Sequence, residues 1–524
     1  MPAPDLLKEF NAFRGEDEGA TVCPAPLVNL HFSQLGVVTA CCFNRTQVLG
    51  VYPKNSVREI WEGAAAAELR EALARGDLSK GCEKCLQQIE ARDFGGSHAV
   101  FYSRHARIMA DRRSELGMVP PADGSVTPLP MKLEFNIHNA CNLQCVMCHG
   151  LASSAIRTRR EALGAMPNPY DDELFVDQLA PYLPYVVETD FMGGEPFLIP
   201  LYQRIWARIG EVNPKTRVCI LTNATILDDR IKKILESINC WIHVSIDSFR
   251  KETYETIRRG ASFDEVMANA KYFHALMRQR GLPILWRLCP MRLNWHELPD
   301  TLQYCTDHEI ALFYNQLDSP IGLSLTTLPA AELAHVADTL EKQEPRLPAT
   351  PIGLENLRNY RELVARLRGF LQPENRIAGL RSRLDTARAV VSHYSSVEDR
   401  LSQAVKNYLI TRLNVEDADG ELPVEFAERV DQVRLILAGL RHEVSSSHFL
   451  STYLKELIRT YSGVWGVVGT HDTDVFRRID ELVASVTANG DDWDRVMRQP
   501  PKGVYEAIGL TLSVDGMRRW LADL

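Results

Sequence analysis

The chain has 524 residues, of which 45% are hydrophobic and 24% charged, with a formal net charge of −9. This composition is ordinary for a globular protein of about three domains, and its acidic balance argues against a nucleic-acid partner, which usually leaves a basic footprint. The N-terminus lacks the apolar core of a signal peptide, and no run approaches the roughly 20 apolar residues that cross a bilayer, so we expect a cytoplasmic protein with no membrane partner.

Residues 1–125 are expected to form a small cysteine-bearing unit. A short strand is indicated just ahead of Cys41. Ser56 and Glu59 have the spacing of a capping box, which opens a helix expected to reach about Ala74. Because thiols stay reduced in the cytosol, the 12 cysteines of the chain are expected to be metal ligands or buried apolar residues rather than disulfides.

Residues 126–347 alternate between strand-like and helix-like segments. Helical stretches such as 228–238 and 264–280 separate six apolar, β-branched runs. These runs are Leu133–Ile137, Tyr185–Phe191, Val218–Leu221, Trp241–Ile246, Ile284–Leu288 and Ala311–Tyr314. Six βα units in succession predict an α/β fold with a parallel sheet, either open or curled into a partial barrel. In barrels of this kind, chemistry gathers at the C-terminal ends of the strands.

Residues 348–524 have a helical pattern almost to the end. The clearest segments are Leu357–Leu371, Val397–Leu413 and Phe426–Val444. This region contains no metal, nucleotide or nucleophile motif. We therefore expect an all-α C-terminal domain that serves packing, dimerisation or substrate recognition, and the sequence leaves the oligomeric state open.

Three cysteines, Cys141, Cys145 and Cys148, follow the first predicted strand and are expected in the loop above its C-terminal end. Thiolates are the preferred ligands of iron–sulfur clusters. Three of them in one loop can hold three corners of a cube and leave one iron open for a second molecule. A zinc site is the alternative, with His149 as a fourth ligand.

This C-x3-C-x2-C spacing, together with four further features in chain order, resembles the radical S-adenosylmethionine (SAM) superfamily. The resemblance implies a TIM-like partial (β/α)6 barrel and a 4Fe–4S cluster that binds SAM at its open iron. It implies an electron donor such as flavodoxin or ferredoxin, and reductive cleavage of SAM to a 5′-deoxyadenosyl radical. That radical takes a hydrogen atom from an unactivated C–H bond, while the protein supplies positioning and electrostatics.

The four further features imply contacts to SAM. Met192–Pro196 is similar to the family's GGEP motif, in which Gly193 and Gly194 let the backbone approach a ligand closely. In this motif Glu195 is expected to accept hydrogen bonds from the SAM ammonium. The remaining features, which resemble the family's T-N-G segment and its contacts to the SAM ribose and carboxylate, are Asn223, Ser245, Asp247 and Arg258.

Two further residues near the expected site are weaker candidates. His149 stands where the family usually has an aromatic residue; stacking on adenine is the favoured role, with proton transfer or cluster ligation as alternatives. Cys289 ends the fifth predicted strand and is a candidate to face the substrate. By contrast, Cys219, Cys240 and Cys305 are expected to be buried apolar residues. No other catalytic residue is assigned.

A second cluster is expected in the N-terminal block. The C-x12-G-x4-C pattern from Cys23 to Cys41, followed by C-x2-C at Cys82 and Cys85, resembles the auxiliary-cluster module called SPASM, or its shorter twitch form. The longer form has a further cysteine where this chain has Ala91, so the resemblance implies one auxiliary 4Fe–4S cluster on those four thiols. Most relatives carry this module after the barrel, whereas here it comes first.

Two alternatives stay open for that module, namely Cys42 in place of Cys41 and a structural zinc site in place of iron–sulfur. The implied function is oxidation or cross-linking of a peptide or small-molecule natural product after hydrogen abstraction, with the auxiliary cluster assisting. One alternative is a non-catalytic iron–sulfur or zinc scaffold. Another is a radical SAM methyltransferase, although the cobalamin domain or extra catalytic cysteines that usually accompany that activity are not evident in the sequence.

Overall fold

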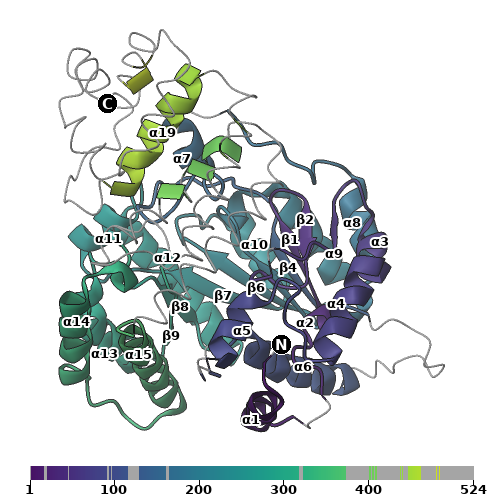
Figure 1. Cartoon of the computed structure of the whole chain (residues 1–524), viewed down its shortest axis with the longest axis horizontal. Coiled ribbons are helices and arrows are strands. Elements are labelled where there is room, and N and C mark those ends of the chain that lie inside the picture. Colours follow the sequence, from purple (N-terminus) through teal and green to yellow (C-terminus); the bar gives the residue numbers. More distant parts are fainter. Residues whose placement is uncertain are drawn as a thin grey trace.

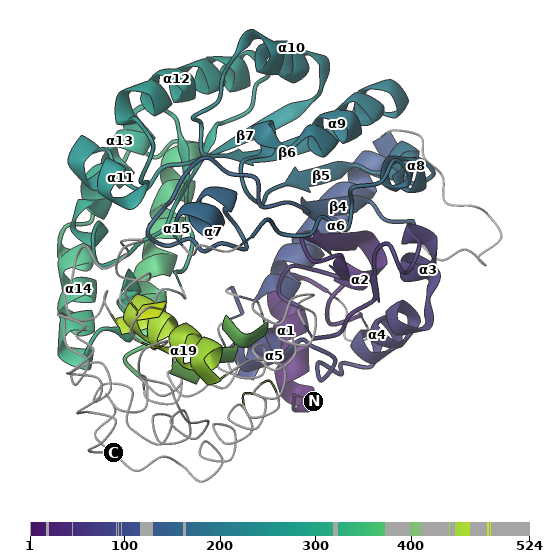
Figure 2. The ribbon, with the colours of Figure 1, turned by 90° about the horizontal axis from the view of Figure 1, so that it is seen from above.

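The computed structural model (Figures 1 and 2) describes residues 2–115, 129–317 and 323–372, apart from gaps at 17–19, 45, 91, 93, 96 and 161–163, together with scattered residues between 400 and 483. Within these residues, no helix is long and apolar enough to cross a membrane. The two helices expected over Val397–Leu413 and Phe426–Val444 lie largely outside the described residues.

A sheet of nine strands organises the described part of the chain, in the order β3-β2-β1-β4-β5-β6-β7-β8-β9. From β4 to β9, every pair of neighbouring strands is parallel. These six strands are β4 (Lys132–Asn136), β5 (Glu188–Phe191), β6 (Arg217–Thr222), β7 (Cys240–Ser245), β8 (Leu285–Leu288) and β9 (Ala311–Tyr314). The predicted parallel α/β sheet is therefore confirmed, strand by strand.

The N-terminal block extends this same sheet. Strand β1 (Asn29–Ser33) pairs in parallel with β4 and antiparallel with β2 (Val37–Thr39), which in turn pairs with β3 (Gly50–Val51). The predicted domain boundary at residue 125 therefore falls between strands of one continuous sheet. The sequence indicated only β2, because the polar residues Asn29 and His31 interrupt the apolar pattern of β1.

The helix expected from Ser56 to Ala74 is two helices, α3 (Val57–Glu62) and α4 (Ala64–Ala74). The capping box is present: the Ser56 hydroxyl accepts from Glu59 N–H at 3.2 Å, and the Glu59 carboxylate accepts from Ser56 N–H at 2.8 Å. At Gly63 the backbone is extended, with φ −71° and ψ 165°, so α3 ends and a new helix begins.

One face of the sheet packs against helices and forms the hydrophobic core. The ring centroids of Phe135 and Phe191 lie 4.9 Å apart, and Phe191 meets Trp206 edge-on at 5.4 Å. The helices on this outer side (Figure 2) are α8 (Leu174–Leu179), α9 (Pro200–Val212), α10 (Asp229–Ser237), α12 (Phe263–Gln279) and α13 (Leu298–Asp307). Because successive strand residues point to opposite faces, the alternate positions must face the other side.

That opposite face of β1 and β4–β9, here called the inner face, is polar. Helix α6 (His98–Glu115) contributes two side chains to it. The Tyr102 hydroxyl donates to Glu134 Oε1 at 2.7 Å, and His105 Nε2 lies 2.7 Å from Glu188 Oε1. The inner face is thus built jointly by the barrel strands and by a helix that precedes them in the chain.

Helix α15 (Pro351–Gly369) covers the β9 edge of the sheet. Asn356 Oδ1 accepts from Leu312 N–H at 2.8 Å, and Asn359 Nδ2 donates to the Leu312 carbonyl at 2.9 Å. Helix α14 (Ala330–Lys342) packs on α15, and α19 (Ser446–Tyr461) lies on the concave side of the sheet (Figure 2). Helix α15 therefore packs on the barrel sheet, although it lies beyond the predicted domain boundary at residue 347.

Candidate active site

The loop that carries Cys141, Cys145 and Cys148 follows β4, as the sequence predicted, and its own side chains hold its shape. Ser154 Oγ accepts from Cys141 N–H at 3.1 Å, and the Arg160 guanidinium donates to the Cys148 carbonyl at 2.8 Å. All three thiols are largely buried, and burial raises the pKa of Cys145 to about 11 and that of Cys148 to about 12. Thiols in such a place need a metal to stay ionised.

The two glycines of the GGEP-like segment lie directly against the start of this cysteine loop. Both have a positive φ, 82° at Gly193 and 54° at Gly194. A Cβ on Gly193 would lie 2.0 Å from Asn136 Oδ1, and one on Gly194 would lie 2.2 Å from the Ala140 carbonyl. Glycine is therefore required at both positions for the segment to pack on the loop.

The Glu195 carboxylate is fully buried and already has three protein donors. It accepts from Thr222 Oγ1 at 2.8 Å, from Asn223 N–H at 2.7 Å and from Phe197 N–H at 3.3 Å. Burial raises the pKa of Glu195 to about 7, although these hydrogen bonds oppose the rise. Glu195 thus joins the β5 and β6 loops, and its contact to the SAM ammonium stays a prediction.

This raised pKa leads to a pH-dependent affinity for SAM. An ammonium pairs with the ionised carboxylate, which dominates only above about pH 7, so binding should tighten about fivefold to tenfold from pH 6 to pH 7.5. In Glu195→Gln the affinity should be weaker and nearly constant over the same range. Equilibrium dialysis with labelled SAM on the cluster-loaded protein measures this affinity. If Glu195→Gln kept the pH dependence of the wild type, the assigned contact would be contradicted.

The loop after β6 touches the cysteine loop through Asn223. Its Nδ2 donates to Asn142 Oδ1 at 3.0 Å and lies 3.9 Å from Cys141 Sγ, within the range of a weak N–H···S contact. Asn142 Nδ2 in turn donates to Thr225 Oγ1 at 2.8 Å. The segment Thr222–Thr225 therefore lies beside the thiol of Cys141, where a polar N–H can shift the reduction potential of a bound cluster.

Asp247 and Arg258, which the resemblance placed at the SAM ribose and carboxylate, are paired with each other. Arg258 Nε lies 2.7 Å from Asp247 Oδ2, and their side chains are 9% and 0% exposed. Burial lowers the pKa of Arg258, but the carboxylate of Asp247 more than offsets this, so the guanidinium stays charged. Their contacts to SAM remain predictions, and in this structure both serve an internal ion pair.

The segment around Arg258 also fastens the cysteine loop from its other side. Gln144 N–H donates to the Arg259 carbonyl and Val146 N–H to the Ile257 carbonyl, both at 2.9 Å. The loop of Cys141, Cys145 and Cys148 is therefore held between the ends of β5, β6 and β7. The structure thus brings the GGEP-like segment, Asn223, Asp247 and Arg258 together around this loop.

The weaker candidates are located as follows. Cys289 follows β8, and its N–H donates to Asp247 Oδ1 at 2.8 Å. Burial and the Asp247 carboxylate raise the pKa of its thiol, and the nearby thiols of Cys145 and Cys148 raise this pKa further. Ser245 ends β7, half-buried on the inner face. The His149 carbonyl accepts from Ala152 N–H at 2.9 Å within the loop. The roles predicted for these residues stay predictions.

Four cysteines of the N-terminal block form a second group. Burial raises the pKa of Cys82, and three neighbouring thiols raise it further. These neighbours are Cys23, Cys85 and Cys41. Asn44 links two of the four, because its N–H donates to Cys41 Sγ at 3.3 Å and its Nδ2 to Cys82 Sγ at 3.5 Å. Mutually close, buried thiols with N–H donors suit an iron–sulfur cluster.

The N-terminus of α6 adjoins this second group. Burial raises the pKa of Cys85, and hydrogen bonds from Ser97 and from the backbone N–H groups of Ala99 and His98 oppose the rise. Backbone N–H groups at a helix N-terminus stabilise negative charge. The same helix that lines the inner face thus also donates to a thiol of the second group.

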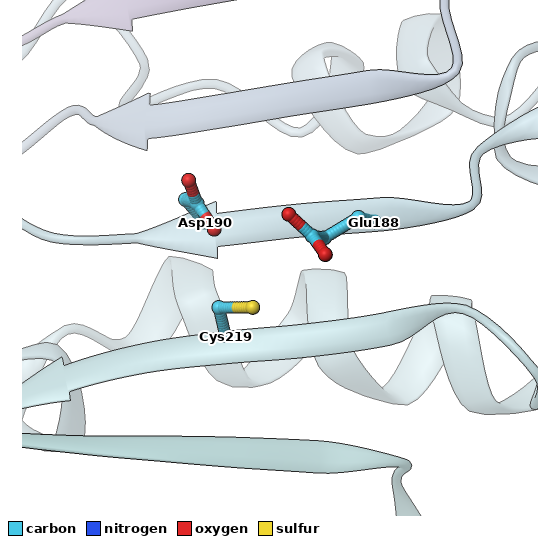
Figure 3. Close-up of side chains that lie close together, drawn as sticks. All are labelled: Glu188, Asp190 and Cys219. Carbon is cyan, nitrogen blue, oxygen red and sulfur yellow. The ribbon is translucent and has the colours of Figure 1, made fainter. Parts of the chain in front are cut away.

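Glu188, Asp190 and Cys219 also lie close together on the inner face, as Figure 3 shows, with ligand atoms within 4.8 Å of one another. Lys132 Nζ lies 2.7 Å from both carboxylates and Arg217 lies 3.7 Å from Glu188, so two cations already neighbour the two carboxylates. Burial also keeps the pKa of the Cys219 thiol well above its usual range. This group is an ion-paired cluster, and Cys219 is buried beside it, as predicted for this cysteine.

Comparison with protein families identifies the two cysteine-bearing segments. Residues 135–305 match the Radical SAM superfamily, and residues 23–86 match an iron-sulfur cluster-binding domain called SPASM. The described chain therefore contains a radical SAM domain. A second, SPASM-type cluster-binding domain precedes it in the chain, as the cysteine pattern predicted. The cofactors of these domains are a 4Fe–4S cluster with SAM and an auxiliary iron–sulfur cluster.

Curated relatives match a little over a third of this chain. A GTP 3',8-cyclase of Limosilactobacillus fermentum is 27% identical over 201 residues, which are 37% of this chain and 55% of the relative. Those of Lactiplantibacillus plantarum and Chlorobaculum tepidum are 27% and 26% identical, over 56% and 52% of their length. The chain thus spans about half the length of the curated relatives it matches.

Similar solved structures include Streptococcus suis SuiB bound to S-adenosylmethionine, at 17% identity and a TM-score of 0.31, covering 51% of this chain and 59% of SuiB. Another is anSMEcpe with bound AdoMet, at 18% identity and a TM-score of 0.31, covering 40% of this chain and 58% of the other.

Sequence reasoning missed the residues that support the cysteines. Asn44 and Arg160 belong to no motif, because their partners include a thiol and a backbone carbonyl that lie elsewhere in the chain. Only Asn44 left a local signal: its Oδ1 accepts from Gln47 N–H, three residues on, at 3.0 Å, a local side-chain-to-backbone bond of the kind that Asn favours in turns.

Proposed function

We propose that this protein is a radical SAM enzyme that abstracts hydrogen from an unactivated C–H bond and that its auxiliary cluster assists oxidation or cross-linking of the substrate. The observation that supports this most is the convergence of the connections after β5, β6 and β7 on one loop that carries three cysteines. Cys141, Cys145 and Cys148 would hold the cluster. When bound, this cluster and SAM supply the one-electron and radical chemistry.

The chain's own residues position and shield that chemistry. The cysteine loop is fixed by hydrogen bonds to its neighbours, which keeps the three thiols in place. Asp247 and Arg258 are buried beside Cys145 and fix the β7 loop against Cys289 N–H.

The N-terminal thiols would hold the auxiliary cluster. The N-terminal block also contains α6 and β1, which contribute to the inner face, so this cluster would lie beside that face. Cys23, Cys41, Cys82 and Cys85 are the proposed ligands, since Asn44 donates to both Cys41 and Cys82. The curated relatives are named for GTP, a small anionic molecule, which favours a small-molecule substrate over a peptide.

Release of 5′-deoxyadenosine tests the proposal. The reconstituted, reduced protein should convert SAM to 5′-deoxyadenosine and methionine under anaerobic conditions, even without substrate. Cys145→Ala should lose this activity by more than about 100-fold, because three thiolates are needed to hold the cluster. Cys305→Ala is the matched control, since that thiol is buried in the core away from the site. A wild-type protein that holds its clusters but releases no 5′-deoxyadenosine would refute the enzyme assignment, and S-adenosylhomocysteine among the products would instead indicate methyl transfer.

A further inference from the structure

The charged side chains of the inner face are paired with one another, with one exception. Lys132 bridges Glu188 and Asp190, Arg217 lies 3.7 Å from Glu188, and Glu134 lies 3.4 Å from His31. The side chain of Arg287 on β8 makes no ion pair with the residues that the structure describes, and its Nε is buried without a hydrogen-bond partner among them. Two cations, Lys132 and Arg217, thus lie against the carboxylates of the barrel floor, and in the described structure Arg287 is the inner-face cation whose guanidinium has no carboxylate partner.

Arg287 lies at the C-terminal end of the inner face. Register places Ser245, Arg287 and Phe313 side by side on β7, β8 and β9. Arg287 is half-buried, and its Nε is shielded from solvent without an acceptor in the described structure. Withdrawing part of a guanidinium from water without a partner costs free energy, which an anionic ligand would recover.

The neighbour of Arg287 is apolar and open. Its guanidinium carbon lies 5.4 Å from the centroid of the Phe313 ring, and Phe313 is 43% exposed although it belongs to an inner-face strand. One position below, His243 is buried, and burial together with the positive charge of Arg287 keeps its pKa well below the usual range, so it is neutral. The cation and the exposed ring therefore face the same space.

We propose that Arg287 and Phe313 form a substrate subsite that binds an anionic group, carboxylate or phosphate, with an apolar or planar part of the substrate on the Phe313 ring. The bidentate guanidinium fits both anions. This inference deepens the proposed function by naming the substrate class of the same barrel. It makes the substrate an anion held at the C-terminal end of the inner face, on β8 and β9.

The SAM carboxylate is the competing partner for Arg287, and it is distinguishable by experiment. Arg258, which the sequence placed near that carboxylate, is occupied by Asp247 in this structure. If Arg287 served SAM instead, its loss would raise the SAM concentration needed for half-maximal cleavage. If it serves the substrate, SAM cleavage without substrate should change by less than about twofold.

Binding of two matched probe pairs to the cluster-loaded protein with SAM tests the subsite. GTP against guanosine reports phosphate, and benzoate against benzamide reports carboxylate; anaerobic saturation-transfer NMR measures each affinity. In the wild type, at least one anionic probe should bind about tenfold or more tightly than its neutral partner. Arg287→Met should abolish that preference and Arg287→Lys should retain part of it, since lysine keeps the charge but not the fork. Phe313→Ala should weaken both members of the preferred pair.

Arg208→Met is the control, because it removes the same charge from an exposed position on α9. Three results would each overturn the subsite. The first is an equal preference for the anionic probe in Arg287→Met and Arg208→Met, and the second is no such preference in the wild type. The third is a large rise in the SAM concentration that Arg287→Met needs for half-maximal cleavage. Release of 5′-deoxyadenosine by the same preparations is measured alongside. Its absence would refute the enzyme assignment, whereas the probe affinities decide the subsite on their own.

Discussion

Replacing Cys85 with alanine is expected to remove about four iron atoms per chain while leaving reductive cleavage of SAM in place. Cys85 is buried among the thiols of Cys23, Cys41 and Cys82 and is the one that the N-terminus of α6 approaches. Losing one of four thiolates in a group this closely packed leaves an iron without its protein ligand. The three thiols of the barrel loop lie in a separate segment and should keep their own cluster.

Iron and zinc analysis of the anaerobically reconstituted protein, with the Mössbauer spectrum, measures this effect. Cys41→Ala should behave like Cys85→Ala, whereas Cys42→Ala is the matched control and should retain both clusters. The reason is the pair of N–H···S contacts from Asn44, which join Cys41 to Cys82. Stoichiometric zinc in the wild type, or iron loss in Cys42→Ala but not in Cys41→Ala, would contradict the proposed ligand set.

Replacing Arg258 with methionine is expected to destabilise the radical SAM domain by about 3–5 kcal/mol. The substitution leaves the Asp247 carboxylate without its cation at a position where the side chain is 0% exposed. A loss of this size lowers the midpoint of thermal unfolding by on the order of 10 °C in a domain of this length. Anaerobic circular dichroism of the cluster-loaded protein follows the transition.

The double variant Arg258→Met with Asp247→Asn separates charge from packing. Because it removes both charges together, it should recover much of the lost stability, as expected when a buried ion pair is removed as a unit. Arg259→Met is the control, since Arg259 is only half-buried and has no ion pair in the described structure. A similar melting point for Arg258→Met and Arg259→Met would show that the ion pair contributes little.

The parallel strands could be predicted from sequence because each is buried on one face and rich in β-branched or aromatic residues. Ala311–Tyr314 was predicted at both bounds. The same reasoning failed for β1, where Asn29 and His31 carry polar groups that the fold satisfies through distant partners. It also failed at Gly63, since one extended residue splits a helix without changing its apolar spacing. Long-range pairing leaves no periodic signal.

For the candidate site, spacing alone indicated which segments meet but not how their side chains pair. Motif order placed Glu195, Asp247 and Arg258 at one end of the sheet, and the structure brings their segments together there. The ion pair of Asp247 with Arg258 and the buried contacts of Glu195 depend on rotamers and burial, which a sequence does not contain. Arg287 was missed for the same reason, because its significance is that its guanidinium has no carboxylate partner in the described structure.

The position of β1 between β2 and β4 has a consequence for how the protein is made. The N-terminal residues leave the ribosome first, yet one edge of β1 stays unpaired until β4, about a hundred residues later, has emerged. An unpaired strand edge is prone to associate with other chains. Assembly of the nascent N-terminal segment must therefore wait for the first barrel strand, and fragments ending before β4 should aggregate rather than fold by themselves.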